Sequence, residues 1–142
     1  MPATEAAAKA TKSSISTAPV GRKLLLKPGQ RIALVNAPAG YRQKLEPLPE
    51  GARLSEALEP GGDAVIIFVR SEAELTELAP AALKAVKPDG LMWVCYLKGG
   101  ARAGSDLHRD TLNAAVHKLG WEGVSLVAFD DAWSAMRLRP GR

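Results

Sequence analysis

The segment Asn36-Ala37-Pro38-Ala39-Gly40-Tyr41 carries residue types that can contact a small molecule. The Asn36 amide can donate a hydrogen bond, Gly40 can adopt a positive φ at little cost, and Tyr41 can stack on a flat ring. The segment follows the β-rich run 31–35, so it would lie where the carboxyl ends of parallel strands form a ligand crevice. These three residues are therefore candidate ligand contacts, although position alone does not make a site. The alternative is that Asn36-Ala37-Pro38 is a rigid turn and Tyr41 belongs to the core.

Arg70 is a second candidate, for binding an anion. It follows the continuous apolar run 64–69, which predicts a buried strand, so it also falls at a strand's carboxyl end. Its guanidinium could clamp a carboxylate or a phosphate. The alternative is that it pairs with Glu72 or Glu74 in the helix that follows.

The glycine-rich segment 98–104 adds two further cations, Lys98 and Arg102. It precedes a predicted helix, whose free amides and dipole favour an anion. Gly99 and Gly104 have the spacing of a phosphate-binding loop, but Ser105-Asp106 stands where Lys-Ser or Lys-Thr is required. The pattern therefore argues against nucleoside triphosphate hydrolysis and favours a solvated loop, with weak anion binding as the alternative.

Other reactive residue types do not form a predicted catalytic or metal site. His108 and His117 fall on opposite faces of one predicted helix, and the single cysteine, Cys95, lies in an apolar strand where burial would raise the pKa of its thiol. Asp130 and Asp131 could pose as an acid/base pair, but adjacent side chains point apart and Asp is common in turns. We therefore predict no catalytic residue and no bound metal.

Apolar runs and turn signals predict the elements that would position these residues. A Ser71-x-x-Glu74 capping box begins a helix, in which Pro80 predicts a kink or a division into two short helices. The alternation predicts a single-domain α/β fold, with a mostly parallel sheet in three layers and a C-terminal antiparallel hairpin. The predicted strands span 31–35, 52–55, 64–69 and 91–97, the helices 41–45, 71–86 and 106–119, and the hairpin 124–138.

Composition indicates one globular domain. The 142 residues are 46% hydrophobic and 24% charged, and 1–18 are so rich in Ala, Thr, Ser and Lys that we predict a disordered tail before a domain spanning 19–142. The formal charge of +4 divides into +3 for 1–23, −2 for 24–136 and +3 for 137–142. The body is therefore not basic, and we do not expect nucleic-acid binding. No apolar run reaches the length of a membrane span, so we expect a cytoplasmic protein without membrane contact.

Four stretches resemble a known family, and the likeness covers roughly 16–139. On them the chain resembles an uncharacterised bacterial domain-of-unknown-function family of small proteins whose fold looks like a shortened class I, Rossmann-type methyltransferase. In methyltransferases a helix ending in a Lys-Pro-Gly-Gly-like turn leads into a buried strand, and the last two strands form an antiparallel hairpin. The resemblance thus implies a truncated methyltransferase-like fold. The stretches are 26–38 (LKPGQRIALVNAP), 63–71 (DAVIIFVRS), 83–94 (LKAVKPDGLMWV) and 130–134 (DDAWS).

The resemblance also implies what a cofactor site would need. In the methyltransferases that this chain resembles, the first strand ends in an acidic residue and a Gly-x-Gly loop, which lie against the methionine part of S-adenosylmethionine. A second acidic residue, after strand two, holds the ribose hydroxyls. Here Asn36 and the residues up to Gly40 replace that loop, Pro38 removes an amide, and Glu56 is the acidic candidate of a short second strand. From these departures we predict no cofactor, with S-adenosylmethionine as the alternative.

The leading functional hypothesis is therefore a small non-catalytic domain that binds a protein partner or a small anionic ligand at the carboxyl ends of the strands. The first alternative is an S-adenosylmethionine-dependent methyltransferase relic with residual activity. The second is weak nucleic-acid association through the basic ends of the chain.

Overall fold

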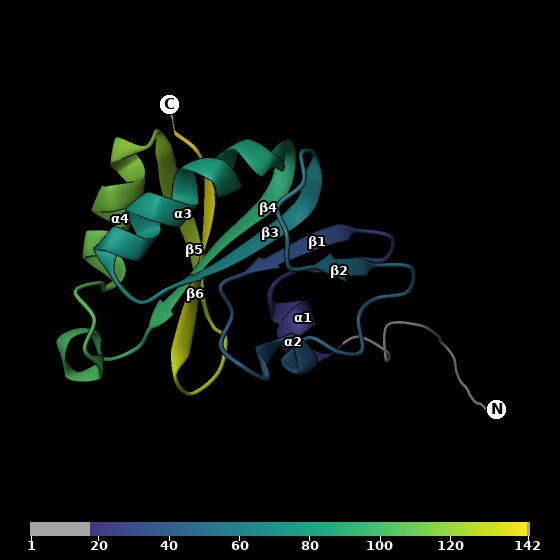
Figure 1. Ribbon diagram of the computed structural model, residues 1–142, viewed down its shortest axis with the longest axis horizontal. Coiled ribbons are helices and arrows are strands. Elements are labelled where there is room, and N and C mark those ends of the chain that lie inside the picture. Colours follow the sequence, from purple (N-terminus) through teal and green to yellow (C-terminus); the bar gives the residue numbers. More distant parts are fainter. Residues whose placement is uncertain (1–17, 142) are drawn as a thin grey trace.

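The computed structural model describes residues 18–141. They form one α/β sheet domain with helices on both faces (Figure 1). Of the predicted tail, 1–17 lie outside the described residues. Ala18 is buried, and its amide donates to the Pro47 carbonyl at 2.9 Å. The helices are α1 (Pro19–Lys23), α2 (Tyr41–Lys44), α3 (Glu72–Ala85), the 3-10 helix η2 (Gly100–Ala103) and α4 (Arg109–Lys118), and the strands are β1 (Arg31–Val35), β2 (Arg53–Ser55), β3 (Gly62–Val69), β4 (Val86–Leu97), β5 (Trp121–Ala128) and β6 (Trp133–Pro140).

The sheet has the order β2-β1-β3-β4-β6-β5. Strands β2, β1, β3 and β4 are parallel, whereas β6 is antiparallel to both β4 and β5. The fold is therefore the predicted one, a mostly parallel sheet that ends in an antiparallel hairpin. The four parallel strands all end at the same edge of the sheet, so the residues that follow β1, β2, β3 and β4 lie along one border.

Two apolar clusters cover the two faces of the sheet. Alternate residues of β3 enter each cluster, because successive side chains of a strand point to opposite faces. Val65, Ile67 and Val69 pack with α3 and α4, and Ile66 and Phe68 pack with Trp93. Every residue from Ala64 to Val69 is completely buried, which explains why this run has no polar alternation.

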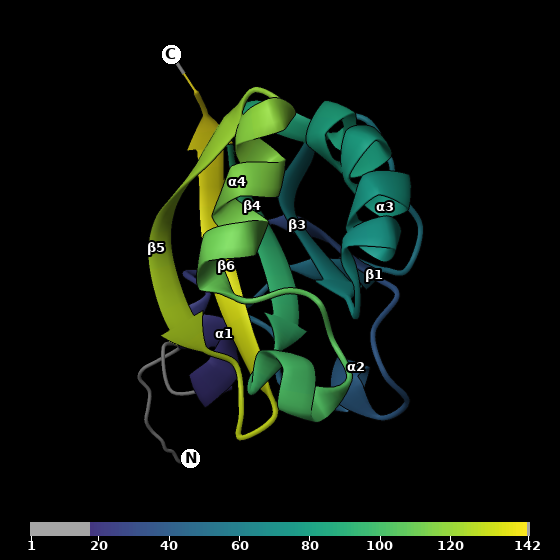
Figure 2. The ribbon, with the colours of Figure 1, turned by 90° about the vertical axis from the view of Figure 1, so that its left-hand side faces the viewer.

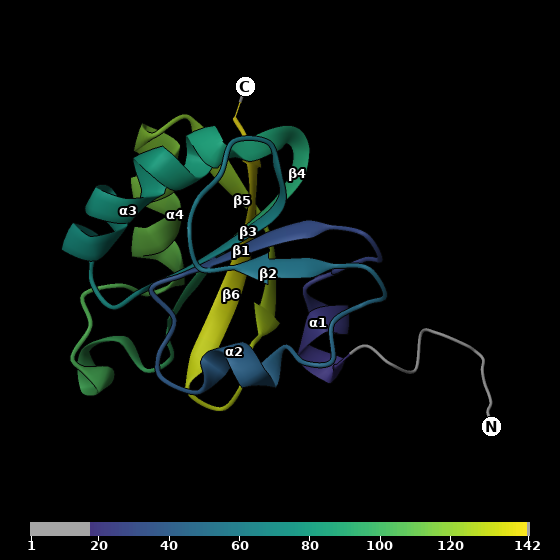
Figure 3. The same cartoon turned by 45° about the vertical axis from the view of Figure 1, so that its right-hand side comes forward.

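The covering of the sheet is uneven. Helices α3 and α4 lie side by side on one face (Figure 2), while α1 and α2, of five and four residues, lie on the other. No helix stands in front of β1 and β2 (Figure 3). The β2–β3 connection is a short loop, so the α3 face of these two strands is thinly covered, whereas Ile32 and Leu34 are buried on the other face. Among the described residues, no helix is both long enough and apolar enough to cross a membrane.

Three local predictions need correction. Helix α3 continues through Pro80 as one element, and β4 begins at Val86, so it includes the Lys87-Pro88-Asp89-Gly90 segment that we predicted to be a turn. A register shift between Gly62 and Ala64 accommodates these residues in the β3–β4 pairing. Helix α4 is shorter than predicted, because η2 and the residues after it occupy the approach to it. The predicted stop at Gly120 is confirmed by its φ of 87°.

Candidate functional site

The loop after β1 is fastened to β3 by Asn36. This residue has a φ of 62°, a left-handed conformation that Asn adopts more readily than most residues. Its Nδ2 donates to the Phe68 carbonyl oxygen at 2.8 Å and to Glu74 Oε1 at 3.4 Å. The candidate donor predicted at Asn36 is therefore engaged within the protein, where it fixes the direction in which the loop leaves β1.

Glu74 joins the carboxyl ends of two strands. Its Oε1 accepts from the Arg70 amide at 2.7 Å as well as from Asn36. The predicted capping box is half confirmed, because the Ser71 hydroxyl accepts from the Glu74 amide at 3.1 Å. The Glu74 side chain, however, bonds the residue before the N-cap instead of the N-cap amide. The helix start of α3 thereby holds the ends of β1 and β3 together.

A hollow of about 320 Å³ lies at the carboxyl ends of β1 and β2. We call it the carboxyl-end hollow. Its walls come from the end of β1, the loop that follows, helix α2 and the residue after β2. The predicted contacts Asn36 and Gly40 line it, and Gly40 has a φ of 84°, as its predicted role required. The lining residues are Leu34, Asn36, Ala37, Pro38, Ala39, Gly40, Arg42, Gln43 and Glu56.

Glu56 places a carboxylate in this hollow. Arg42 Nη1 lies 3.0 Å from Glu56 Oε2, and Arg42 Nη2 donates to the Leu54 carbonyl at 3.2 Å. The Arg42 and Glu56 side chains are 41% and 69% exposed, so their ion pair contributes less than about 1 kcal/mol and is easily exchanged. Sequence reasoning named Glu56 through the resemblance and missed Arg42, which only the turn of α2 brings next to it.

Tyr41 points away from the hollow. Its ring packs among three buried aromatic side chains, with centroids 5.6 Å from Phe68, 5.7 Å from Phe129 and 6.4 Å from Trp133. Its hydroxyl donates to Asp130 Oδ2 at 2.6 Å. The core alternative weighed for Tyr41 thus describes its place, and the space above the β1 loop is left open because this ring does not fill it.

Asp130 is the centre of a polar cluster on the other side of α2. Lys44 Nζ donates to Asp130 Oδ2 at 2.7 Å and lies 4.2 Å from the Tyr41 ring centroid. Asp130 Oδ1 accepts from the Ala132 and Trp133 amides at 2.8 and 2.9 Å. Burial by itself would raise the pKa of Asp130, but the hydrogen bonds from Lys44, Tyr41 and the two amides outweigh it and hold the pKa far below its usual value. This cluster ties α2 to the β5–β6 turn.

The cationic candidates lie outside the carboxyl-end hollow. The Arg70 guanidinium stands over the Trp133 ring, with Cζ 5.5 Å from the centroid, and its predicted pairing with Glu72 or Glu74 is absent from the ion pairs among residues 18–141. The Lys98 amide donates to the Ala132 carbonyl at 2.9 Å, which places Lys98 beside the same turn. Arg102 lies further away in η2. The structure thus brings Arg70 and Lys98 to the β5–β6 turn and leaves Arg102 apart.

The segment 98–104 is folded against the start of α3. The Asp106 Oδ1 atom accepts from the Glu72 amide at 2.8 Å, and the buried Ser105 hydroxyl accepts from the Leu107 amide at 3.1 Å. A first-turn amide of α3 that could have met an anion is therefore satisfied by the chain itself. Cys95 is fully buried, and burial raises the pKa of its thiol well above the usual value, as predicted.

Solved methyltransferases share this fold. No family model matches the chain, and no curated protein matches its sequence. Mitomycin 7-O-methyltransferase MmcR superposes with a TM-score of 0.62 at 11% identity over 86% of this chain, which corresponds to only 53% of the enzyme. An S-adenosylmethionine-dependent methyltransferase from Geobacter sulfurreducens, in complex with S-adenosyl-L-homocysteine, gives 0.55 at 12% identity over 85% of this chain and 88% of the other. Another from Aquifex aeolicus gives 0.55 at 15% identity over 84% and 86%.

These likenesses establish a methyltransferase-like fold and correct the functional prediction. The leading hypothesis, a non-catalytic domain that binds a protein partner or a small anionic ligand, is wrong, because methyltransferases recur among the similar structures and favour the first alternative. The prediction relied on the departures in the β1 loop, chiefly Pro38. Those departures remove one amide, but they leave the space above the loop open.

Proposed function

We propose that the chain binds S-adenosylmethionine in the carboxyl-end hollow and acts as a methyltransferase. The observation that carries the proposal is that the β1 loop and the Glu56 carboxylate line one hollow of about 320 Å³ at the ends of adjacent parallel strands. That volume lies in the range of small-molecule sites, and the position is where open α/β sheets bind ligands. Similar folds were solved with S-adenosyl-L-homocysteine, which supports the same choice of ligand.

The residues of the hollow fit the adenosyl group in a specific way. Glu56 offers a carboxylate that can accept hydrogen bonds from two ribose hydroxyls, provided that Arg42 turns away from it. The exposure of both partners makes that exchange inexpensive. Gly40 lets the loop turn closely at the edge of the hollow. Asn36 would position the loop and would not contact the ligand through its side-chain amide, because that amide donates to the Phe68 carbonyl of β3.

The chain's own residues would bind and orient the reactants. Bound S-adenosylmethionine would supply an electrophilic methyl group. We place the methyl acceptor beyond the hollow, towards the Arg70 guanidinium over Trp133 and towards Lys98, whose backbone amide is bonded to the β5–β6 turn. Arg70 is kept in place by the Trp133 ring and spends no charge on a carboxylate within residues 18–141, so it is available to an incoming group.

The test is calorimetric titration of the full chain with S-adenosyl-L-homocysteine and S-adenosylmethionine. We expect saturable binding at one site and a Kd at least about tenfold weaker in Glu56→Gln, since hydrogen bonds to a charged acceptor contribute about 1.5 to 3 kcal/mol. Glu77→Gln is the matched control, because Glu77 is an exposed residue of α3 outside the hollow. Absence of saturable binding by the folded protein up to millimolar ligand would overturn the proposal.

Several finer assignments are also proposals. They are membership of the uncharacterised bacterial family, a cytoplasmic location, a domain that begins near Pro19, and the absence of nucleic-acid and membrane partners. The family resemblance rests on four short stretches of sequence, and the charge argument rests on a body of net −2 between basic ends.

A further inference from the structure

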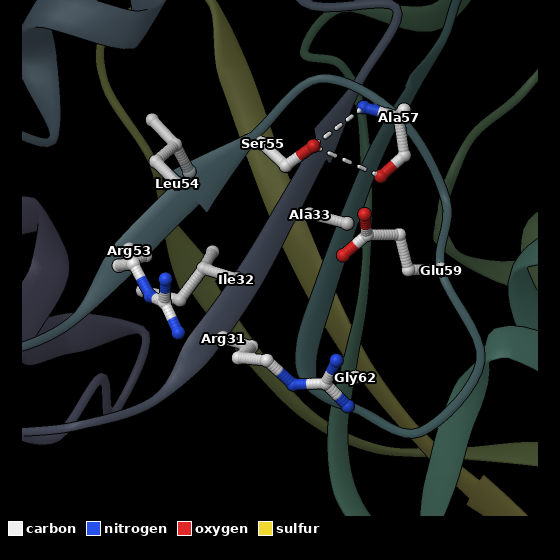
Figure 4. Close-up of a pocket in the computed structure, with 9 residues that line it drawn as sticks. All are labelled: Arg31, Ile32, Ala33, Arg53, Leu54, Ser55, Ala57, Glu59 and Gly62. Carbon is white, nitrogen blue, oxygen red and sulfur yellow. Dashed lines mark hydrogen bonds between the residues drawn. The ribbon is translucent and has the colours of Figure 1, made fainter.

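A second hollow, also of about 320 Å³, lies over β1 and β2 (Figure 4). We call it the sheet-face hollow. Ala33 contributes to it and also belongs to the apolar cluster of α3, so the hollow lies on the α3 face of the sheet. It exists because α3 and α4 cover only the strands from β3 onward, and the β2–β3 loop alone shields this part (Figure 3).

Two arginine side chains, Arg31 and Arg53, line this hollow (Figure 4). Arg31 and Arg53 are the first residues of adjacent parallel strands and pair in register, so their side chains share one face. Like charges placed directly across two strands repel each other and destabilise the pairing. Among residues 18–141, neither side chain forms an ion pair with a carboxylate. The positive charge of the pair is therefore left to be neutralised by something else.

The Arg31 guanidinium is held in place by neutral groups. Its Nη2 donates to the Gly61 carbonyl at 2.7 Å and to the Pro60 carbonyl at 3.2 Å. These bonds use both hydrogens of Nη2 and leave the three N–H groups on Nε and Nη1 without a described acceptor. The carbonyls fix the direction of the guanidinium without neutralising its charge. The group is therefore preorganised to bind an anion.

Gly61 helps to hold the Arg31 guanidinium in this position. Gly61 has a φ of 78°, and a Cβ there would lie 3.1 Å from Arg31 Nη2. A side chain would thus both strain the backbone and push the guanidinium away. The loop conformation and the position of Arg31 depend on each other.

The carboxylate of Asp63, beside the Arg31 backbone, already has hydrogen-bond and ion-pair partners. Asp63 Oδ2 accepts from the Arg31 amide at 2.8 Å, and Asp63 Oδ1 lies 2.6 Å from Lys87 Nζ. The hydrogen bond from Lys87, with that from the Arg31 amide, lowers the pKa of Asp63. Glu59 lies on the opposite wall of the hollow, near Ala33 (Figure 4). The oxyanion group of a ligand would therefore bind on the arginine side of the hollow. Hydrogen-bond donors elsewhere on the same ligand could bind the Glu59 carboxylate.

We propose that the sheet-face hollow binds the oxyanion group, carboxylate or phosphate, of a small molecule between Arg31 and Arg53. The site is separate from the carboxyl-end hollow and does not depend on the proposed function. Arginine suits this role because its planar fork matches the geometry of both oxyanions.

The experiment is a nuclear magnetic resonance titration of the full ¹⁵N-labelled chain with inorganic phosphate in one arm and acetate in the other, at constant ionic strength. We expect saturable shifts of the Gly61 and Gly62 amides and of the arginine Nε–H signals. Whichever anion gives the lower Kd identifies the type of oxyanion. Arg53→Gln should weaken binding at least fivefold, and its fold should be intact because the Arg53 guanidinium bonds nothing in the described chain.

Two further variants keep the test decisive. Lys118→Gln removes the same charge from the end of α4 and should leave the Kd unchanged within a factor of two. Gly61→Ala should weaken binding by displacing the Arg31 guanidinium. Equal binding by Arg53→Gln and the unaltered chain, equal weakening by Lys118→Gln, or no saturable shift with either anion in folded protein would each overturn the proposal.

Discussion

The two hollows flank the same pair of strands and differ in what lines them. The carboxyl-end hollow is walled mainly by the β1 loop and α2, and its charges are an arginine and a glutamate that pair with each other. The sheet-face hollow is walled mainly by strand residues, with Ala57 and Glu59 from the β2–β3 loop, and its two arginines have no carboxylate partner within residues 18–141. Leu34 and Ala33, consecutive in β1, face one each.

This difference teaches how a thinly covered edge can serve two ligands. Where the connections around β1 and β2 are short, open space remains over the α3 face of the sheet and at the carboxyl ends of the strands. Loop geometry shapes one space and side-chain alternation shapes the other. The first favours a ligand that can displace an ion pair, and the second favours one that supplies the missing negative charge.

The largest expected effect separates the two hollows through Asp130. In Asp130→Ala the Tyr41 hydroxyl, Lys44 and two backbone amides lose their acceptor, so we expect a loss of about 2 kcal/mol in unfolding free energy by urea denaturation. Because α2 is then no longer tied to the β5–β6 turn, S-adenosyl-L-homocysteine should bind more weakly. Phosphate binding in the folded variant should not change. Equal weakening of both ligands would contradict this division.

Competition between the ligands gives the next test. If the hollows are independent sites, saturating phosphate should leave the Kd for S-adenosyl-L-homocysteine within about a factor of two at constant ionic strength. Calorimetric titration with and without phosphate measures this. A tenfold or larger weakening would mean that one site takes both ligands.

The loss of unfolding free energy at low pH tests the contribution of Asp130. Its pKa in the folded chain lies below its value of about 3.9 in an unfolded chain, so its stabilisation is complete above pH 4 and is lost as the pH falls towards the folded value. Asp130→Asn lacks this dependence. We therefore expect the unaltered chain to lose stability more steeply than Asp130→Asn below about pH 4 in urea denaturation. Parallel curves would show that other carboxyl groups dominate.

The smallest effect concerns the arginine pair without a ligand. Arg53→Gln removes the repulsion between register partners, so we expect unfolding free energy to rise by about 0.3 kcal/mol in low salt and less in high salt. Thermal or urea denaturation at two salt concentrations measures it. A decrease in stability would show that Arg53 has an attractive partner and would weaken the anion argument.

The alternation of strands and helices could be predicted from the sequence because its signals are local. The buried run 64–69, the Ser71 cap and the stop at Gly120 each depend on neighbouring residues, and each was found where predicted. The error at 87–90 has a tertiary cause, since Val86 and Leu91 on either side of these residues pair with Gly62 and Ala64 of β3, and the register shift between the two pairs takes up the residues in between. A turn-like composition gives way when a partner strand lies alongside.

The sites could be predicted only in part. The position of Asn36 and Gly40 follows from the end of β1, and Glu56 from the end of β2. The Tyr41–Asp130 hydrogen bond joins residues 89 positions apart, and the Arg31–Arg53 pairing depends on the register of β1 and β2. No local pattern encodes such contacts, so Lys44, Arg31 and Arg53 were missed as functional groups, and Asp130 was considered only as part of an acid/base pair with Asp131.

The brevity of β2 has a consequence for hydrogen exchange. This strand is three residues long and pairs with no strand other than β1, so we expect its amides to exchange with deuterated solvent before those of β3 and β4. Residues on both sides of it border the two hollows. A molecule bound in either hollow would therefore slow deuterium uptake at Leu54 and Ser55. Exchange at this one strand would report the occupancy of both hollows.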